Sequence, residues 1–254
     1  MSFEIWQGLV LIVVGAISGF LNVMAGGGSL LTVPVMVFMG MPGPVANGTN
    51  RIAILAQNIA AITAFFKKGF SDFKLSLSLA VCTLPGALIG AYIGSRLEGV
   101  WFNRILAIIM LGVMLVMFFD KGKKAQREKV ELTRKRLVFG HLAMIGVGFY
   151  GGFIQVGVGF VLMPILYRIL GLDLVRVNMH KVFIIGVYTV VALCVFAIRV
   201  EILWLLGGCL ALGNMAGGWV GAHVSVSRGE TAIKVVLNSI LIIFIIKLLF
   251  FQSV

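Results

Sequence analysis

Two glycine-rich interruptions of apolar sequence contain the residue types best suited to bind a small anion. In the first, Asn22 precedes Gly26, Gly27 and Gly28, and Ser29 follows them. Each glycine disfavours a helix by about 1 kcal/mol relative to alanine, so the tract predicts a helix break. Ser29 is a suitable N-cap for a short helix beyond it. The free N–H groups and partial positive charge of that helix start predict an anion-binding site.

The second half of the chain repeats this arrangement more weakly, from Gln155 through Gly157 to Gly159. A purely structural role, in which the glycines only let two helices approach closely, is the alternative for either tract. Two matching breaks that each open a short apolar segment are typical of transporter binding sites. We therefore expect both segments to contact a substrate.

Arg51 and Lys181 occupy equivalent positions near the start of two long apolar segments, and each follows a polar residue, Asn50 or His180. An ionisable side chain inside an apolar span is costly without a partner and indicates function. The alternative is that both side chains extend to the nearby membrane surface. Arginine suits two-point binding of an oxyanion, whereas lysine offers a point charge. We expect these four residues to contribute to substrate binding.

The sequence places no carboxylate in the middle of an apolar segment to pair with Arg51 or Lys181. All nine acidic residues stand in connections or near segment ends. This leaves the substrate as a candidate counter-ion and removes the usual carboxylate site for a proton or a sodium ion. His180 is then the candidate for proton coupling, with a hydrogen-bonded packing role as the alternative.

Signatures of other chemistry are missing from the sequence. Neither H-E-x-x-H nor G-x-S-x-G occurs. The three cysteines, Cys82, Cys194 and Cys209, lie in apolar segments and have neither metal-ligand spacing nor the even count of a disulfide framework. We therefore expect no enzyme activity, no cofactor and no metal site. An intramembrane hydrolase built on Ser29 is the remaining alternative.

The composition identifies the environment in which these residues work. Hydrophobic residues make up 60% of the 254 positions and charged residues only 12%, about half the charged share of a soluble domain. A net charge of +12 is typical of some nucleic-acid-binding proteins, but here the basic residues gather between apolar runs, where they set membrane orientation. We expect an all-α, multi-pass membrane protein whose partner is the lipid bilayer and not nucleic acid.

Apolar segments of two lengths divide the chain. Eight are long enough, or nearly so, for a transmembrane helix of about 20 residues. Two more, 29–40 and 160–170, would extend only about 16–18 Å as helices, short of a hydrocarbon core of about 30 Å. The sequence therefore predicts about eight long helices and two short, discontinuous ones. The long segments are 5–24, 49–66, 75–94, 102–119, 137–155, 179–198, 202–223 and 231–251.

The two halves of the chain follow one plan, which predicts an internal repeat. We expect a first repeat at 1–119, a basic cytoplasmic linker at 120–136 and a second repeat at 137–254. The linker contains 11 of the 30 charged residues. Under a shift of 130 residues, the corresponding pairs are Gly27 with Gly157, Pro34 with Pro164, and Arg51 with Lys181.

The number of membrane crossings per half decides the symmetry. If each short segment completes a crossing, each half crosses five times and the repeats are inverted. The positive-inside rule then places fifteen lysines and arginines inside and three outside. If the short segments re-enter on one side, the repeats are parallel and the division is twelve to six. The stronger bias favours inverted repeats, with both chain ends outside.

Small residues at four-residue spacing mark one helix in each half. Such spacing lets helices pack closely in lipid. We expect these helices to seat against the broken helices of their own or the other half, with a homodimer interface as the alternative. The residues are Gly86, Gly90 and Gly94, and then Gly213, Gly217, Gly221 and Ser225.

Several motifs occur in a characteristic order. They are the glycine-rich tract within 19–48, then Leu30-Leu31-x-x-Pro34, Gly40, Ala46-x-Gly48-Thr49-Asn50 and Leu84-Pro85-Gly86-Ala87-Leu88-Ile89-Gly90-Ala91. Together they resemble the TauE/SafE family, the sulfite exporter and 4-toluene sulfonate uptake group. The resemblance implies a bacterial inner-membrane carrier of small sulfur-containing or organic anions such as sulfite, sulfonates and sulfoacetate.

The residues and the resemblance lead to one functional expectation. We expect a secondary transporter of small oxyanions, which binds its substrate near the membrane midplane between the two glycine breaks. An anion channel with the same charges is the alternative. The sequence leaves open the exact substrate, the direction of transport, the coupling ion and the oligomeric state.

Overall fold

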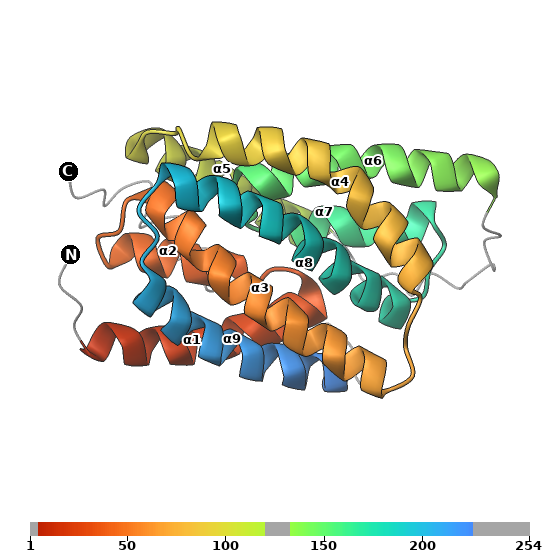
Figure 1. The fold of residues 1–254 in the computed structure, drawn as a ribbon, viewed down its shortest axis with the longest axis horizontal. Helices are drawn as coiled ribbons and strands as arrows, with labels where there is room; N and C mark the ends of the chain where they lie inside the picture. The colour runs from red at the N-terminus through yellow and green to blue at the C-terminus, as the bar shows by residue number, and fades with distance from the viewer. Residues whose placement is uncertain (1–4, 120–132, 226–254) are drawn as a thin grey trace.

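The computed structural model describes residues 5–119 and 133–225, and every regular element within these ranges is helical (Figure 1). This confirms an all-α membrane protein. The predicted helix at 231–251 and most of the predicted linker lie outside the described residues. The elements are α1 (Ile5–Ala25), α2 (Ser29–Phe38), α3 (Gly43–Lys67), α4 (Phe73–Gly94), α5 (Gly99–Phe119), α6 (Arg134–Phe153), α7 (Val158–Pro164), the π-helical turn η1 (Ile165–Ile169), α8 (Leu174–Arg199) and α9 (Trp204–Ser225).

Five of the described helices are long and apolar enough to cross a membrane, namely α1, α4, α6, α8 and α9. The 25-residue α3 differs because one of its faces is polar and buried. It also begins at Gly43, six residues before the predicted start. Pro44 explains the earlier start, because proline is well suited to the first turn of a helix. Arg51 therefore stands in the third turn of α3, deeper in the helix than the sequence indicated.

The second short segment is divided by its proline. Helix α7 ends at Pro164 and continues as the π-helical turn η1. Proline has no backbone N–H to donate and crowds the preceding turn, which disrupts regular α-helical hydrogen bonding. The first short segment also contains a proline, Pro34, but remains α-helical to Phe38.

The small-residue stripes pack each helix against the first long helix of the other half. Along α9, a Cβ on Gly213 or Gly217 would collide with main-chain atoms of α1 near Ile12 and Ala16. Along α4, a Cβ on Gly86 would collide with the main chain of α6. The stripes therefore lie inside the molecule, as the packing interpretation predicted, and close backbone contact stabilises both helix pairs.

The contacts of α3 establish the relative directions of the helices. Thr49 lies against Gly207 and Gln57 against Gly218, so α3 runs parallel to α9. By contrast, Gly48 lies against Phe196 while Asn58 lies against Gly186, ten residues earlier, so α3 and α8 are antiparallel.

The chain reverses direction between α1 and α3, and α2 is the segment that runs back. Helix α1 also runs parallel to α9, because Ala16 meets Gly217 and Phe20 meets Gly221. Helices α1 and α3 thus point the same way, and α2 brings the chain back between them (Figure 1). In the same view α1 begins at one end of the molecule and α6 begins at the other.

The helices form three layers. The pair α1 and α9 lies on one side, the pair α4 and α6 lies on the other, and α3 and α8 pack between them (Figure 1). Helix α3 contacts α9 and α8, while α8 contacts α4. The polar face of α3 is therefore enclosed by helices from both halves.

Gly148 and Gly146 provide a matched test of this packing on one helix. A Cβ at Gly148 would collide with the main chain of Thr83, whereas one at Gly146 has no atom within 4 Å. We expect Gly148→Ala to lower the free energy of unfolding by roughly 1–3 kcal/mol. Gly146→Ala should leave it unchanged or raise it by up to about 1 kcal/mol. Unfolding in detergent micelles measures both, and equal stabilities would contradict the close contact of α4 with α6.

Candidate functional site

The two predicted breaks are present, and they touch. Helix α1 ends at Ala25 and α2 begins at Ser29, while α6 ends at Phe153 and α7 begins at Val158. The backbones meet so closely that a Cβ on Gly26 would collide with Gly159, and one on Gly159 with Gly26. Only glycine permits this approach. The crossing therefore brings together segments about 130 residues apart in the chain.

The backbone at the crossing takes conformations that side chains rarely adopt. Gly26 has φ +81° and Gly157 has φ +70°. Gln155 is the one non-glycine residue with positive φ in the described part of the chain, at +61°. Its side chain explains why this strain is retained. The Gln155 amide accepts a hydrogen bond from Arg51 Nη1 at 2.8 Å and donates one to Thr189 Oγ1 at 3.1 Å.

Ser29 does not act as the predicted N-cap. The N-cap position of α2 is Gly28, and Ser29 is the first helical residue. The Ser29 hydroxyl instead makes a long hydrogen bond of 3.5 Å to the carbonyl oxygen of Gln155. The side chain thus joins the two breaks, because the second break approaches closely enough to compete with local capping.

Arg51 binds the carboxyl-terminal end of α6. The side chain is fully buried. Nη1 donates to the carbonyl oxygen of Gly151 at 3.1 Å and Nη2 donates to that of Gly152. Its guanidinium carbon lies 4.5 Å from the centre of the Phe196 ring. A cation at this position is favourable because the last carbonyls of a helix carry partial negative charge.

Lys181 makes the equivalent contact at the end of α1. Its Nζ donates to the carbonyl oxygen of Val23 at 2.9 Å and to Asn178 Oδ1 at 2.8 Å, and the side chain is 1% exposed. Neither Arg51 nor Lys181 extends to the membrane surface. Each half of the chain therefore supplies a cation to the end of the broken helix in the other half.

The hydrogen-bond partners of Arg51 are all neutral. They are two main-chain carbonyls and the Gln155 amide oxygen, and Nε has no partner among the described residues. The described acids lie elsewhere, and Asp72 and Asp173 cap α4 and α8. Helix-end carbonyls offset only part of a full positive charge.

Two further buried groups that can donate lack an acceptor, one on the residue before Arg51 and one beside its Gly151 acceptor. Asn50 Oδ1 accepts from Thr32 Oγ1 at 2.7 Å, but Asn50 Nδ2 has no partner among the described residues. The Tyr188 hydroxyl, which lies against Gly151, has none there either. Because an unpaired buried donor costs about 1–3 kcal/mol, this group is suited to receive an acceptor-rich ligand such as an oxyanion.

The remaining predicted residues take different places. Asn22 lies beside Gly28 and donates to Gln57 Oε1 at 3.0 Å. His180 is fully buried but faces α4, where its Nδ1 is hydrogen-bonded to Ser76 Oγ at 2.7 Å. The structure thus brings Ser29, Asn50, Arg51 and Gln155 together and separates His180 from them.

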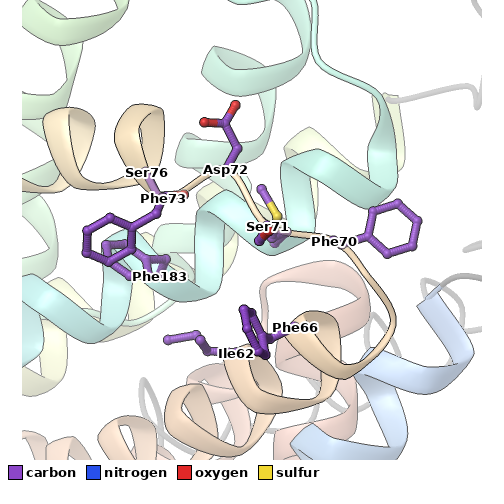
Figure 2. Close-up of a pocket in the computed structure, with 9 residues that line it drawn as sticks. Ile62, Phe66, Phe70, Ser71, Asp72, Phe73, Ser76 and Phe183 are labelled. Atoms are coloured by element: carbon purple, nitrogen blue, oxygen red, sulfur yellow. The ribbon is translucent and has the colours of Figure 1, made fainter.

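Ser76 also lines a cavity of about 290 Å³ at the α3–α4 connection. Figure 2 shows its mainly apolar wall, with Phe73 beside Phe183 and with Phe66 and Ile62 contributed by α3. The ring centres of Phe73 and Phe183 are 5.5 Å apart, in an edge-to-face arrangement. The cavity therefore differs in chemistry from the polar crossing.

Sequence reasoning missed several neutral polar residues that are buried in the core. Their signal was an uncharged polar side chain within an apolar helix, which is weaker than the signal of a charge. The missed residues are Ser18, Thr32, Gln57, Asn58, Tyr188, Thr189 and Asn214.

Comparisons with known proteins match the chain to a family of membrane proteins. A family model described as "Sulfite exporter TauE/SafE" matches residues 11–248. A probable membrane transporter protein of Haemophilus influenzae is 25% identical over 225 residues, which cover 89% of this chain and 88% of the relative. No solved structure matches the chain.

Two further relatives have similar coverage. The probable membrane transporter protein ORF9 of a Sinorhizobium species is 27% identical over 241 residues, covering 94% of this chain and 91% of the relative. The probable membrane transporter protein YfcA of Escherichia coli K12 is 25% identical over 244 residues, covering 95% and 89%.

The geometry of Arg51 can be tested by a substitution that preserves its charge. One lysine ammonium cannot reach the Gly151, Gly152 and Gln155 acceptors as the planar guanidinium does. We expect Arg51→Lys to lower the free energy of unfolding by about 1–3 kcal/mol. Arg104→Lys, at an exposed arginine of α5, is the matched control and should change it little. Thermal unfolding in detergent measures both, and similar small changes would argue against the helix-end contact.

Proposed function

The chain belongs to the TauE/SafE sulfite exporter family, and from that premise we propose that it is a secondary transporter of small oxyanions. Its substrates would be sulfur-containing or organic anions such as sulfite and sulfonates, carried across a bacterial inner membrane. Its relatives are probable membrane transporters, which points away from an enzyme.

The buried charge of Arg51 is the observation that carries this proposal. A charged group at membrane depth is costly, and partially charged carbonyls compensate for it only in part. The partnerless Nε of Arg51 is a donor that a sulfite or sulfonate oxygen would accept from, and the amide of Asn50, the preceding residue, carries a second unpaired donor. An anion bound at Arg51 would therefore both neutralise the buried charge and accept hydrogen bonds from the unpaired donors.

We place the anion between the two breaks. Gly27, Gly28 and Ser29 would bind from the start of α2, and Gln155, Gly157 and Gly159 from the second break. Asn22, Asn50, Arg51 and Lys181 complete the proposed set. The 3.5 Å contact between Ser29 Oγ and the Gln155 carbonyl supports this location, because it shows that the two segments share one small region.

The proposed transport cycle alternates access across this crossing. We propose inverted repeats of five crossings each, in which every short segment completes a crossing. The parallel course of α3 and α9 and the antiparallel course of α3 and α8 support this topology. A site at the interface of two inverted halves can open to either side when one half rocks against the other.

Single cysteines at the two ends of α8 test the topology. In a background lacking Cys82, Cys194 and Cys209, we expect Glu201→Cys to react with a membrane-impermeant maleimide from outside intact cells. Arg176→Cys should react only after the membrane is opened, because the positive-inside rule places this end in the cytoplasm. The reverse labelling pattern would indicate parallel repeats with re-entrant short segments.

Flux measurements test the function itself. In proteoliposomes, we expect saturable uptake of sulfite or a simple sulfonate that is accelerated by the same anion on the opposite side. Arg51→Met should lower the initial rate at least about tenfold, since a charge-assisted hydrogen bond contributes about 1.5–3 kcal/mol. Arg104→Met, an exposed position, is the control.

Two outcomes would contradict the transporter assignment. Unitary anion currents without acceleration by anion on the opposite side would identify an anion channel instead. Full activity of both Arg51→Met and Lys181→Met would remove the proposed site, because the two cations supply its charge.

A further inference from the structure

A second group of buried polar residues adjoins the proposed anion site and shares Asn22 with it. Ser18, Asn22, Gln57 and Asn214 come from α1, α3 and α9, and each is 4% exposed or less. Asn22 donates to Gln57 Oε1, and the Gln57 side chain packs on Gly218. The main chain of Asn214 packs against Gly15 and Gly19 of α1. We call these four residues the amide cluster.

The amide cluster has unused hydrogen-bonding capacity. Ser18 Oγ, Gln57 Nε2 and both amide atoms of Asn214 have no partner among the described residues. Buried polar groups are normally paired, and an unpaired one destabilises the protein. These four atoms, on α1, α3 and α9, are available to a ligand that can both donate and accept hydrogen bonds.

The cluster faces the start of α2. A Cβ added to Gly28 would lie 2.8 Å from Ser18 Oγ and would collide with Asn22 Cβ. The next residue, Ser29, contacts Gln155, which in turn binds Arg51. Gly28 and Ser29 therefore lie between the amide cluster on one side and the arginine on the other.

We propose that the amide cluster is a second subsite, which binds a hydroxyl or amide group of the transported anion. The inference rests on the proposed function and defines its substrate class more closely. The preferred substrate is then a small sulfonate that carries such a group, in preference to a simple alkyl sulfonate or inorganic sulfite.

The chemistry of the cluster determines this choice. Gln57 Nε2 and Asn214 Nδ2 are donors, Asn214 Oδ1 is an acceptor, and a serine hydroxyl can be either. A neutral group that both donates and accepts satisfies this set, as a hydroxyl or an amide does. None of the four residues is charged, so a carboxylate or an ammonium group bound among them would have no counter-ion within the amide cluster.

A matched pair of substrates tests the proposal. Ethanesulfonate and 2-hydroxyethanesulfonate have the same charge and differ by one hydroxyl. In proteoliposomes of the full chain, we expect the hydroxylated anion to have a half-saturation concentration about tenfold lower. A site built to pair a hydroxyl disfavours the analogue that leaves its polar groups unpaired.

Asn214→Leu should reduce the ratio of the two half-saturation concentrations from about ten towards one. Thr83→Val is the matched control, because Thr83 is also a buried polar residue of a long helix but lies outside the amide cluster. Its hydroxyl is already hydrogen-bonded to the Ala80 carbonyl within α4, so the ratio should stay near ten. Ser18→Ala, a smaller change, should lower the ratio if Asn214→Leu does not fold.

Thermal unfolding adds a readout that a purely structural role would not produce. Removing unpaired buried atoms should leave the melting temperature of the empty Asn214→Leu protein unchanged or raise it. In the unsubstituted protein, 2-hydroxyethanesulfonate should raise the melting temperature more than ethanesulfonate does, and the variant should lose this difference.

The outcomes distinguish a failure of the subsite from a failure of the transporter assignment. Equal half-saturation concentrations in the unsubstituted protein, with both sulfonates transported, would overturn the subsite and leave the transporter assignment intact. Such a result would mean that the amide cluster holds only water. If no sulfonate or sulfite is transported at all, the proposed function fails and the subsite fails with it.

Discussion

The ends of helices that stop inside a membrane impose the main constraint on this structure. Lipid cannot hydrogen-bond the free carbonyls of such an end, so other parts of the protein must do so. Arg51 donates to carbonyls at the end of α6, and Lys181 donates to one near the end of α1. Because each cation comes from the other half of the chain, neither broken helix is satisfied unless both halves are assembled.

Close backbone packing makes these contacts reachable. Gly26 and Gly159 allow the two breaks to cross, and glycines along α4 and α9 bring the outer pairs of helices together. A methyl group at several of these positions would separate the helices. In lipid this packing, and not the exclusion of water, draws helices to one another. The glycines thus position the buried polar residues of the site, although they carry no side-chain functional group themselves.

Helix α3 connects the charged and neutral parts of that centre. Arg51 faces the end of α6, and Gln57, less than two turns later, faces α1 and α9. Both leave donors unpaired, which weakens the empty protein but favours a ligand that can pair them. A movement of α3 would change both parts together. Because α3 carries residues of both parts, binding of one small anion is linked to the position of α3 relative to the other half.

The sequence alone determined the membrane setting, the two breaks, their short helices and the buried cations, because composition, glycine tracts and apolar length act locally. It did not determine partners distant in the chain. Gln155 lies 104 residues from Arg51, and this approach redirected Ser29 from its predicted capping role. Pro44 also began α3 earlier than its apolar length indicated. The amide cluster emerged only in the tertiary structure, because a neutral amide in a helix reveals its unpaired atoms only when the surrounding helices are in place.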